Sequence, residues 1–120
     1  MRKSFLFISL AAVMAAPVAS ARTLSPSEAL DRATAEAVMP VSRSGGSPEL
    51  IMTLGSDEAP AIYVFNRSGK GYMILSADDV AAPVIGYSDN GRLDPDNLPE
   101  NLRFWLELNK EQILRASAEG

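Results

Sequence analysis

Two carboxylates adjoin at Asp78-Asp79, and three further acidic residues follow at close spacing as Asp94, Asp96 and Glu100. Paired carboxylates could act as a general acid and base, and clustered carboxylates could bind Ca²⁺. Adjacent residues at the end of a strand usually point to opposite sides, so a polar start of a loop explains the pair better. The second group lacks the glycine and the bidentate glutamate of an EF-hand loop. We therefore predict no metal site and no cofactor.

The chain of 120 residues contains neither cysteine nor histidine. Without cysteine there can be no disulfide, no thiolate nucleophile and no zinc-cysteine site. Without histidine the commonest metal ligand is missing, and so is the usual general base near neutral pH. A complete Ser-His-Asp or Cys-His enzyme cannot be built from these residues, so we expect a protein that is not an enzyme.

Two short motifs carry little weight. The triplet Asn66-Arg67-Ser68 matches a glycosylation acceptor sequence, a pattern that occurs often by chance. Gly69-Lys70-Gly71 resembles a phosphate-binding loop only superficially, because a strand pattern follows it where such a loop requires a helix. Neither motif predicts a function.

The first twenty-one residues have the layout of a secretory signal peptide. Arg2 and Lys3 precede an almost uninterrupted apolar or small stretch over residues 5–16, and Ala19-Ser20-Ala21 supplies a small-x-small cleavage pattern. The apolar stretch is too short for a membrane span, so an uncleaved anchor is the weaker alternative. We predict cleavage after Ala21, and export to the periplasm or the extracellular medium.

Removal of this leader leaves nine basic against fifteen acidic residues in residues 22–120, a formal charge of −6. No basic patch is available to neutralise phosphates, so nucleic-acid binding is not expected. An anionic membrane surface is equally unfavourable for an acidic chain. We expect residues 22–120 to form one small domain that is monomeric when free and that docks onto a protein partner.

Local signals predict a helix, a group of strands and a second helix. Ser25-Pro26-Ser27-Glu28 has the form of a capping box with proline at the first helical position, and Pro40 would end this helix. Residues 41–48, rich in serine and glycine, predict a loop. Strands are then expected over Glu49 to Leu54, Ala61 to Asn66, Tyr72 to Ala77 and Val84 to Ser88. The second and third are apolar on both faces, as strands covered by helices should be.

The second helix is predicted from Pro99 to about Ala116. Leu98, Leu102, Trp105, Leu106 and Ile113 recur at spacings that build one apolar face. Phe104 and Leu108 are expected to widen that face. The whole predicts an α+β fold, in which an antiparallel sheet of about four strands carries an N-terminal helix and a longer C-terminal helix.

Several ordered blocks resemble a known family. The blocks Tyr72 to Asp79 and Pro83 to Ser88, followed by Asn90-Gly91-Arg92-Leu93-Asp94 and Pro99-Glu100-Asn101-Leu102, closely resemble the propeptide of streptopain-type cysteine proteases. They are equally similar to the free-standing Spi inhibitors related to that propeptide. The resemblance covers roughly Ser25 to Ile113.

The resemblance implies a function and a site. In that family the propeptide lies across the protease active site, and an asparagine near the start of the last helix helps to hold the catalytic histidine out of position. Asn101 stands at the matching place, and Leu98, Leu102 and Trp105 beside it could fill apolar protease pockets. From the residues alone, the alternatives are a solvated Asn101 and a core role for its three neighbours.

The resemblance is compatible with three hypotheses about the function. The chain ends at Gly120, where the protease precursors continue into a catalytic domain. We expect a secreted inhibitor of a streptopain-like cysteine protease that acts in trans. The alternatives are a truncated or split propeptide, which would assist folding and maintain latency, and a secreted binding module without a protease partner.

Overall fold

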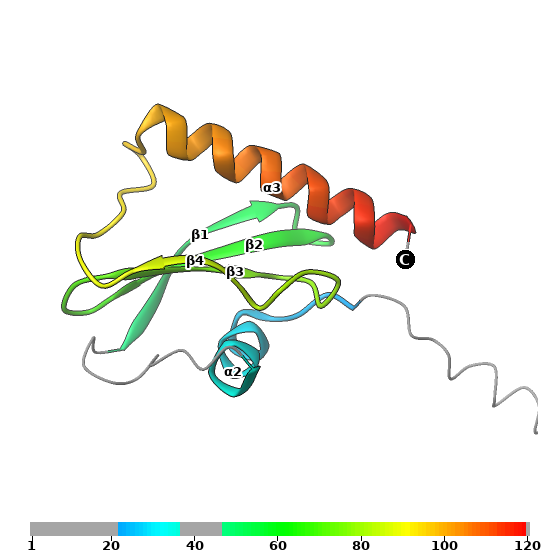
Figure 1. Ribbon diagram of the computed structural model, residues 1–120, viewed down its shortest axis with the longest axis horizontal. Helices are drawn as coiled ribbons and strands as arrows, with labels where there is room; N and C mark the ends of the chain where they lie inside the picture. The colour runs from blue at the N-terminus through cyan, green and yellow to red at the C-terminus, as the bar shows by residue number, and fades with distance from the viewer. Residues whose placement is uncertain (1–21, 37–46, 120) are drawn as a thin grey trace, which may run out of the picture.

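The computed structural model describes residues 22–36 and 47–119, which form two helices and four strands (Figure 1). The predicted signal peptide, the end of the first predicted helix at Pro40 and most of the predicted loop that follows lie outside these residues. The elements are α2 (Pro26–Glu36), β1 (Pro48–Gly55), β2 (Pro60–Arg67), β3 (Tyr72–Ser76), β4 (Val84–Ser88) and α3 (Glu100–Glu119).

The four strands form one antiparallel sheet in the order β1-β2-β3-β4, with a helix on each face (Figure 1). Alternation along β2 divides the core into two clusters. Tyr63 and Phe65 face α2, where they join Ala29 and Ala33, while Ile62 and Val64 belong to the cluster beneath α3. Every residue of β2 is buried, because helices cover both of its faces. The predicted α+β class is therefore confirmed.

The predicted starts of the helices follow the expected local chemistry. The Ser25 amide donates to Glu28 Oε1 over 2.8 Å, and the Glu28 amide donates to Ser25 Oγ over 3.2 Å, which completes the capping box. The hydrogen bond from the Ser25 backbone holds the pKa of the Glu28 carboxyl below its usual value. At the second helix, the Pro99 carbonyl accepts the first helical bond from the Arg103 amide over 3.0 Å. Both helices thus begin within a residue of the predicted positions.

One feature of α3 differs from the prediction. Phe104 and Leu108 were expected on the core face, but they are 71% and 47% exposed. The buried positions of α3 are Leu106 and Ile113, which are seven residues apart and so lie above one another on the helix. At 100° per residue, Phe104 stands about 200° around the helix from Leu106, and it points away from the sheet. The helix is apolar on two sides, and only one can face the sheet.

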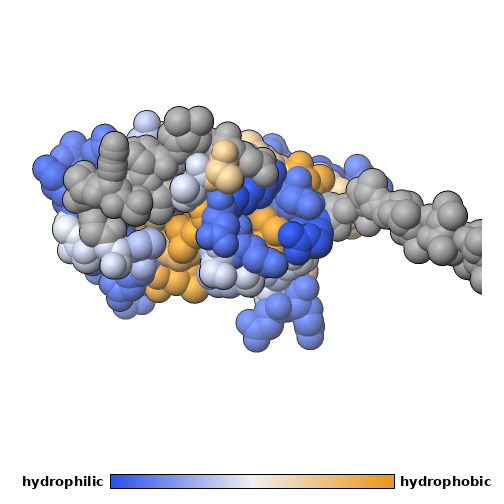
Figure 2. Space-filling model, turned by 90° about the horizontal axis from the view of Figure 1, so that it is seen from below, coloured by the Kyte–Doolittle hydropathy of each residue, from blue (hydrophilic) through white to orange (hydrophobic). Residues whose placement is uncertain are grey.

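The α2 side of the sheet is covered in part. Leu50, Phe65, Met73 and Tyr87 form one cross-strand row on this face, and the residues at its two ends, Leu50 and Tyr87, are 41% and 57% exposed. Seen from this side, hydrophobic surface lies next to hydrophilic side chains (Figure 2). Within the described ranges, neither helix is both long enough and apolar enough to cross a membrane.

Candidate functional site

The exposed side of α3 carries an apolar stripe that begins next to Asn101. Asn101, Phe104, Trp105 and Leu108 are spaced at three, four and seven residues from the first, so they occupy one helical face. We call these four residues the α3 stripe. Phe104 is 71%, Leu108 47% and Trp105 37% exposed, and Asn101 is also exposed. A contiguous set of large apolar side chains around an accessible amide is typical of a protein-binding surface.

A buried asparagine positions the loop that leads into the stripe. The Asn66 side chain donates from Nδ2 to the Leu93 carbonyl over 2.8 Å and accepts from the Leu93 amide at Oδ1 over 3.0 Å. Asn66 is only 3% exposed, and this clamp of two hydrogen bonds, one donated and one accepted, fixes the orientation of its side-chain amide. It attaches residues 89–99 to β2 at Leu93, seven residues before α3 begins at Glu100.

Backbone contacts hold the rest of that loop. The Gly71 amide donates to the Gly91 carbonyl over 2.7 Å, at a position where a Cβ on Gly71 would lie 2.7 Å from the Ser88 carbonyl oxygen. Arg92 donates from its guanidinium to the Arg67 carbonyl. Nearer the helix, Asp94 accepts from the amide of Asp96 through its side chain over 3.0 Å. The start of α3 is therefore presented by an ordered connection.

Loss of the Asn66 clamp should weaken the fold. Asn66→Ala is expected to lower the free energy of unfolding by about 1–3 kcal/mol, because both polar groups of the Leu93 backbone lose a buried partner. Urea denaturation of residues 22–120 at 25 °C measures the change. Asn90→Ala is the matched control, because Asn90 is exposed and, among the residues that the structure describes, only its backbone makes hydrogen bonds. A stability of Asn66→Ala equal to that of Asn90→Ala would contradict the role of the clamp.

The same contacts exclude a glycan at the sequon. The Nδ2 atom to which a sugar would be attached is the donor of the bond to Leu93, and the side chain is buried between β2 and the 89–99 loop. Attachment would require this part of the fold to open. Asn66 is therefore a structural residue.

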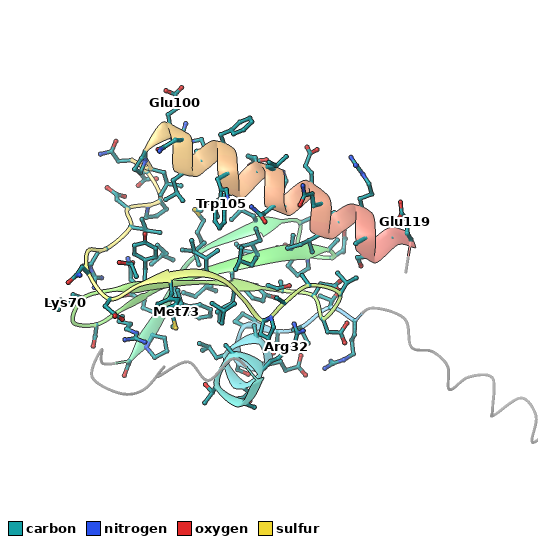
Figure 3. All side chains as sticks on the ribbon, viewed as in Figure 1. Arg32, Lys70, Met73, Glu100, Trp105 and Glu119 are labelled. Atoms are coloured by element: carbon teal, nitrogen blue, oxygen red, sulfur yellow. The ribbon has the colours of Figure 1, made fainter. Side chains whose placement is uncertain are left out.

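Trp105 joins the stripe to the edge of the sheet. Its indole points from α3 towards the sheet (Figure 3), and a Cβ placed on Gly86 of β4 would lie 3.5 Å from Trp105 Cη2. Beyond Trp105 a groove of about 380 Å³ runs between α3 and the β4 edge. It is lined mainly by apolar residues, Val80, Ala81, Ala82, Val84, Ile85, Asn109, Gln112, Ile113 and Ala116. Part of the Trp105 indole therefore packs against β4, and the remainder is accessible to solvent.

The four residues that the resemblance singled out have different surroundings. Asn101 is exposed in the first turn of α3, and its side chain makes no hydrogen bond with the residues that the structure describes. Leu98 is 9% exposed and belongs to the cluster beneath α3, and Leu102 is half-buried against the same cluster. Of these four, Asn101 and Trp105 are therefore the two that are exposed.

Two stripe residues were not among the candidates from the sequence. Phe104 and Leu108 were assigned to the core because they are large and apolar. The spacing carried a signal that could have separated them, because Phe104 stands two residues from both Leu102 and Leu106 and so lies opposite them on a helix. Two apolar faces on one helix indicate either burial on both sides or a binding surface.

Charged groups lie on the other flank of α3. Lys110 Nζ contacts Glu107 Oε1 at 2.7 Å, and this hydrogen bond raises the pKa of the lysine above its usual value. These two residues and Arg103 line a second groove of about 380 Å³ between α3 and β1. The α3 stripe itself contains no charged residue, which suits it to desolvation against a partner.

The Asp78-Asp79 pair is structural. As expected for neighbours at a strand end, the two side chains have different partners: Asp79 accepts from the Arg22 amide over 2.7 Å, and Asp78 accepts from Ser117 Oγ over 2.9 Å. Asp78 is nonetheless 3% exposed, so it is less solvated than the start of a polar loop would be. It also accepts at Oδ1 from the amide of Val80 over 2.9 Å. Asp78 ties the end of α3 to the turn after β3.

Comparison with known protein families gives a match over most of the chain. The family model described as "Spi protease inhibitor" matches residues 16–113 of the chain. The chain belongs to the Spi protease inhibitor family. The resemblance found in the sequence is thereby confirmed. The match includes α2, the four strands and the first fourteen residues of α3, as far as Ile113.

One curated relative of the chain has the name of a protease. The chain is 40% identical over 58 residues to a protein named "Thiol protease/hemagglutinin PrtT" from Porphyromonas gingivalis. This match covers 48% of the chain and 7% of the length of that relative. No solved structure matches the chain significantly.

Proposed function

We propose that this Spi-family protein is exported and inhibits a streptopain-like cysteine protease by covering its active site. The α3 stripe carries this proposal, because it presents an accessible amide beside apolar side chains on a rigid helix. Membership of a protease inhibitor family supports an inhibitory role. The similarity to a protein named as a thiol protease supports a cysteine protease as the class of the target.

The proposed mechanism is steric and needs no chemistry from this chain. Asn101 would enter the active-site cleft at the start of α3, where its uncharged amide can both donate and accept hydrogen bonds. Phe104, Trp105 and Leu108 would be buried against the protease surface beside the cleft. Because Asn66 already holds the 89–99 loop in place, this loop would lose little conformational entropy when the protein binds the protease. The inhibitor would thereby act without turnover.

A titration tests the proposed function. Residues 22–120 are added to a purified streptopain-type protease, and hydrolysis of a fluorogenic peptide is followed. We expect activity to fall to near zero at micromolar inhibitor, while a serine protease tested in parallel keeps its activity. Full activity of the cysteine protease at that concentration would refute the proposal.

Asn101→Ala tests the role of the amide. We expect the inhibition constant to rise about 5–150-fold, equal to about 1–3 kcal/mol, because a hydrogen-bonding position in the buried interface is left unmatched. The free domain should keep its unfolding temperature, since Asn101 is exposed and makes no hydrogen bond within the described residues. Inhibition constants and thermal melts of the same preparation check both points. Unchanged inhibition would remove Asn101 from the mechanism and leave the family unaffected.

The protease relative favours one alternative. A segment similar to this chain forms a small part of that longer protein, so a propeptide that acts within its own precursor is the second candidate. Such a propeptide would assist folding of the catalytic domain and keep it latent. The DNA downstream of the reading frame separates the two candidates, since a catalytic domain in or just out of frame supports the propeptide.

A further inference from the structure

We propose that cleavage after Ala21 converts the Arg22 nitrogen into an ammonium group that forms an ion pair with Asp79 and so locks the N-terminal segment onto the sheet. This inference is independent of the protease partner. It joins the cleavage position that residues 19–21 predict to a hydrogen bond that the fold makes at Arg22.

The fold holds the chain from its predicted mature start. Thr23 pairs with Asp78 as an antiparallel bridge. On either side of it, the Leu24 amide donates to the Ala77 carbonyl over 2.8 Å and the Asp79 amide donates to the Arg22 carbonyl over 3.0 Å. Residues 22–24 thus pair, through an isolated β-bridge, with residues 77–79 that directly follow β3. Leu24 is 3% exposed, which fixes this segment against the core.

A buried tyrosine and the capping box secure the same segment. Tyr63 donates its hydroxyl to the Leu24 carbonyl over 2.6 Å, and burial raises the pKa of that hydroxyl. On the α2 side, Arg22 Nη1 lies 3.5 Å from Glu28 Oε2. The guanidinium of Arg22 therefore has a carboxylate partner of its own, which leaves the Asp79 carboxylate for the backbone nitrogen.

The Arg22 nitrogen is the group that cleavage would change. In the uncleaved chain it is an amide that donates one hydrogen to Asp79 Oδ1 over 2.7 Å. A signal-removing protease adds water across the Ala21–Arg22 bond: hydroxyl goes to the Ala21 carbonyl carbon, and hydrogen goes to the Arg22 nitrogen. At neutral pH that nitrogen takes up one further proton and becomes a cation. A hydrogen bond between two charged groups is shorter and stronger than one from an amide.

The charges around the new ammonium favour it. Asp79 from the turn after β3 contacts the nitrogen itself, while Glu28 from α2 contacts the guanidinium of the same residue. From the same turn, the Asp78 and Ala81 carbonyls accept from the Arg32 guanidinium, so α2 is also attached there (Figure 3). Two carboxylates balance the two positive charges of the mature first residue. The pair would tighten the turn that also contacts the end of α3 through Asp78.

The first experiment locates the cleavage. The full chain of 120 residues is expressed with its own leader in a bacterial host, and the exported product is examined by N-terminal sequencing and intact mass. Arg22 is expected as the first residue. A product that begins at any other residue, or one that keeps its leader, would overturn the proposal.

The second experiment measures the ion pair. Residues 22–120 contain both core clusters, and they are prepared with a free Arg22 amine or with one added glycine before it, which restores the amide. The extended form should melt about 2–5 °C lower at low salt, as expected for an exposed ion pair in a domain of this size. In 1 M NaCl the difference should shrink to less than half, because salt screens the pair.

Variants assign the effect to Asp79. In Asp79→Asn the amide oxygen still accepts a hydrogen bond, but the two N-terminal forms should melt within about 1 °C of each other. Asp57→Asn, an equal change of charge at an exposed turn residue, should keep the full difference. An equal difference in the Asp79→Asn background, or none in the parent, would refute the ion pair. The titration of the protease does not depend on either result.

Discussion

Phe104→Ala is expected to weaken protease inhibition by about 30-fold or more, equal to about 2 kcal/mol, and to leave the stability of the free domain unchanged. Phe104 is 71% exposed, so its ring contributes little to the fold. If the α3 stripe is buried against a protease, the same ring would lie at its centre between Asn101 and Leu108. Aromatic residues in the centre of an interface carry a disproportionate share of the binding energy. Inhibition constants measured beside thermal melts give both values.

Tyr87→Ala is the matched control for Phe104→Ala. Tyr87 is likewise an exposed aromatic residue at 57%, but it lies on the α2 face of the sheet, opposite to α3. Its removal should leave inhibition within about twofold of the parent, as for residues outside the energetic centre of an interface. Equal losses in both variants, or no loss with Phe104→Ala, would show that the α3 stripe is not the contact surface.

Leu106→Ala is expected to cost about 3 kcal/mol of the free energy of unfolding, within the usual range for a leucine removed from a core. Leu106 is 1% exposed and packs in the cluster with Ile62, Val64 and Ile74 of the sheet. Its loss removes one of the main apolar contacts between α3 and the sheet, beside that of Ile113, and leaves a cavity there. For a domain of about 100 residues this loss should lower the unfolding temperature by about 10–20 °C. Urea and thermal denaturation of residues 22–120 measure it.

Leu108→Ala gives the comparison within the same helix. It removes the same atoms two residues further along, from a side chain that is 47% exposed. Its effect on stability should stay below about 0.5 kcal/mol, as for surface substitutions away from special features. The two leucines should therefore differ several-fold in their cost, and similar costs would mean that α3 packs through another face. Weaker inhibition by Leu108→Ala at unchanged stability would extend the binding surface along the stripe.

The elements of the fold were predictable because their signals are local. The capping box at Ser25 and Glu28, the proline before α3 and the apolar runs of β2 and β3 each act within a few residues of the chain. The observed strands begin and end within one residue of the predicted ones. The family resemblance also rests on blocks of this kind, and it was confirmed over residues 16–113.

The partners of the buried polar residues were not predictable. Asn66 and Asp78 were interpreted as parts of a chance motif and of a polar loop, yet both are buried. Their side chains find partners at Leu93 and Ser117, which are 27 and 39 residues away along the chain. A polar residue can be buried only where a partner meets it, and no local pattern shows where a distant segment will return.

By itself the sequence determined the order of the elements, the bounds of the strands to within one residue, the absence of the residue types that most enzymes need, and the family. Only the tertiary structure decided which side of α3 is core and which is surface. Both sides are apolar, but the buried residues of α3 are Leu106 and Ile113, which lie seven residues apart on one side of the helix and pack in the same cluster as the sheet. Phe104 and Leu108 then face outward, since one helix cannot bury opposite faces against a single sheet.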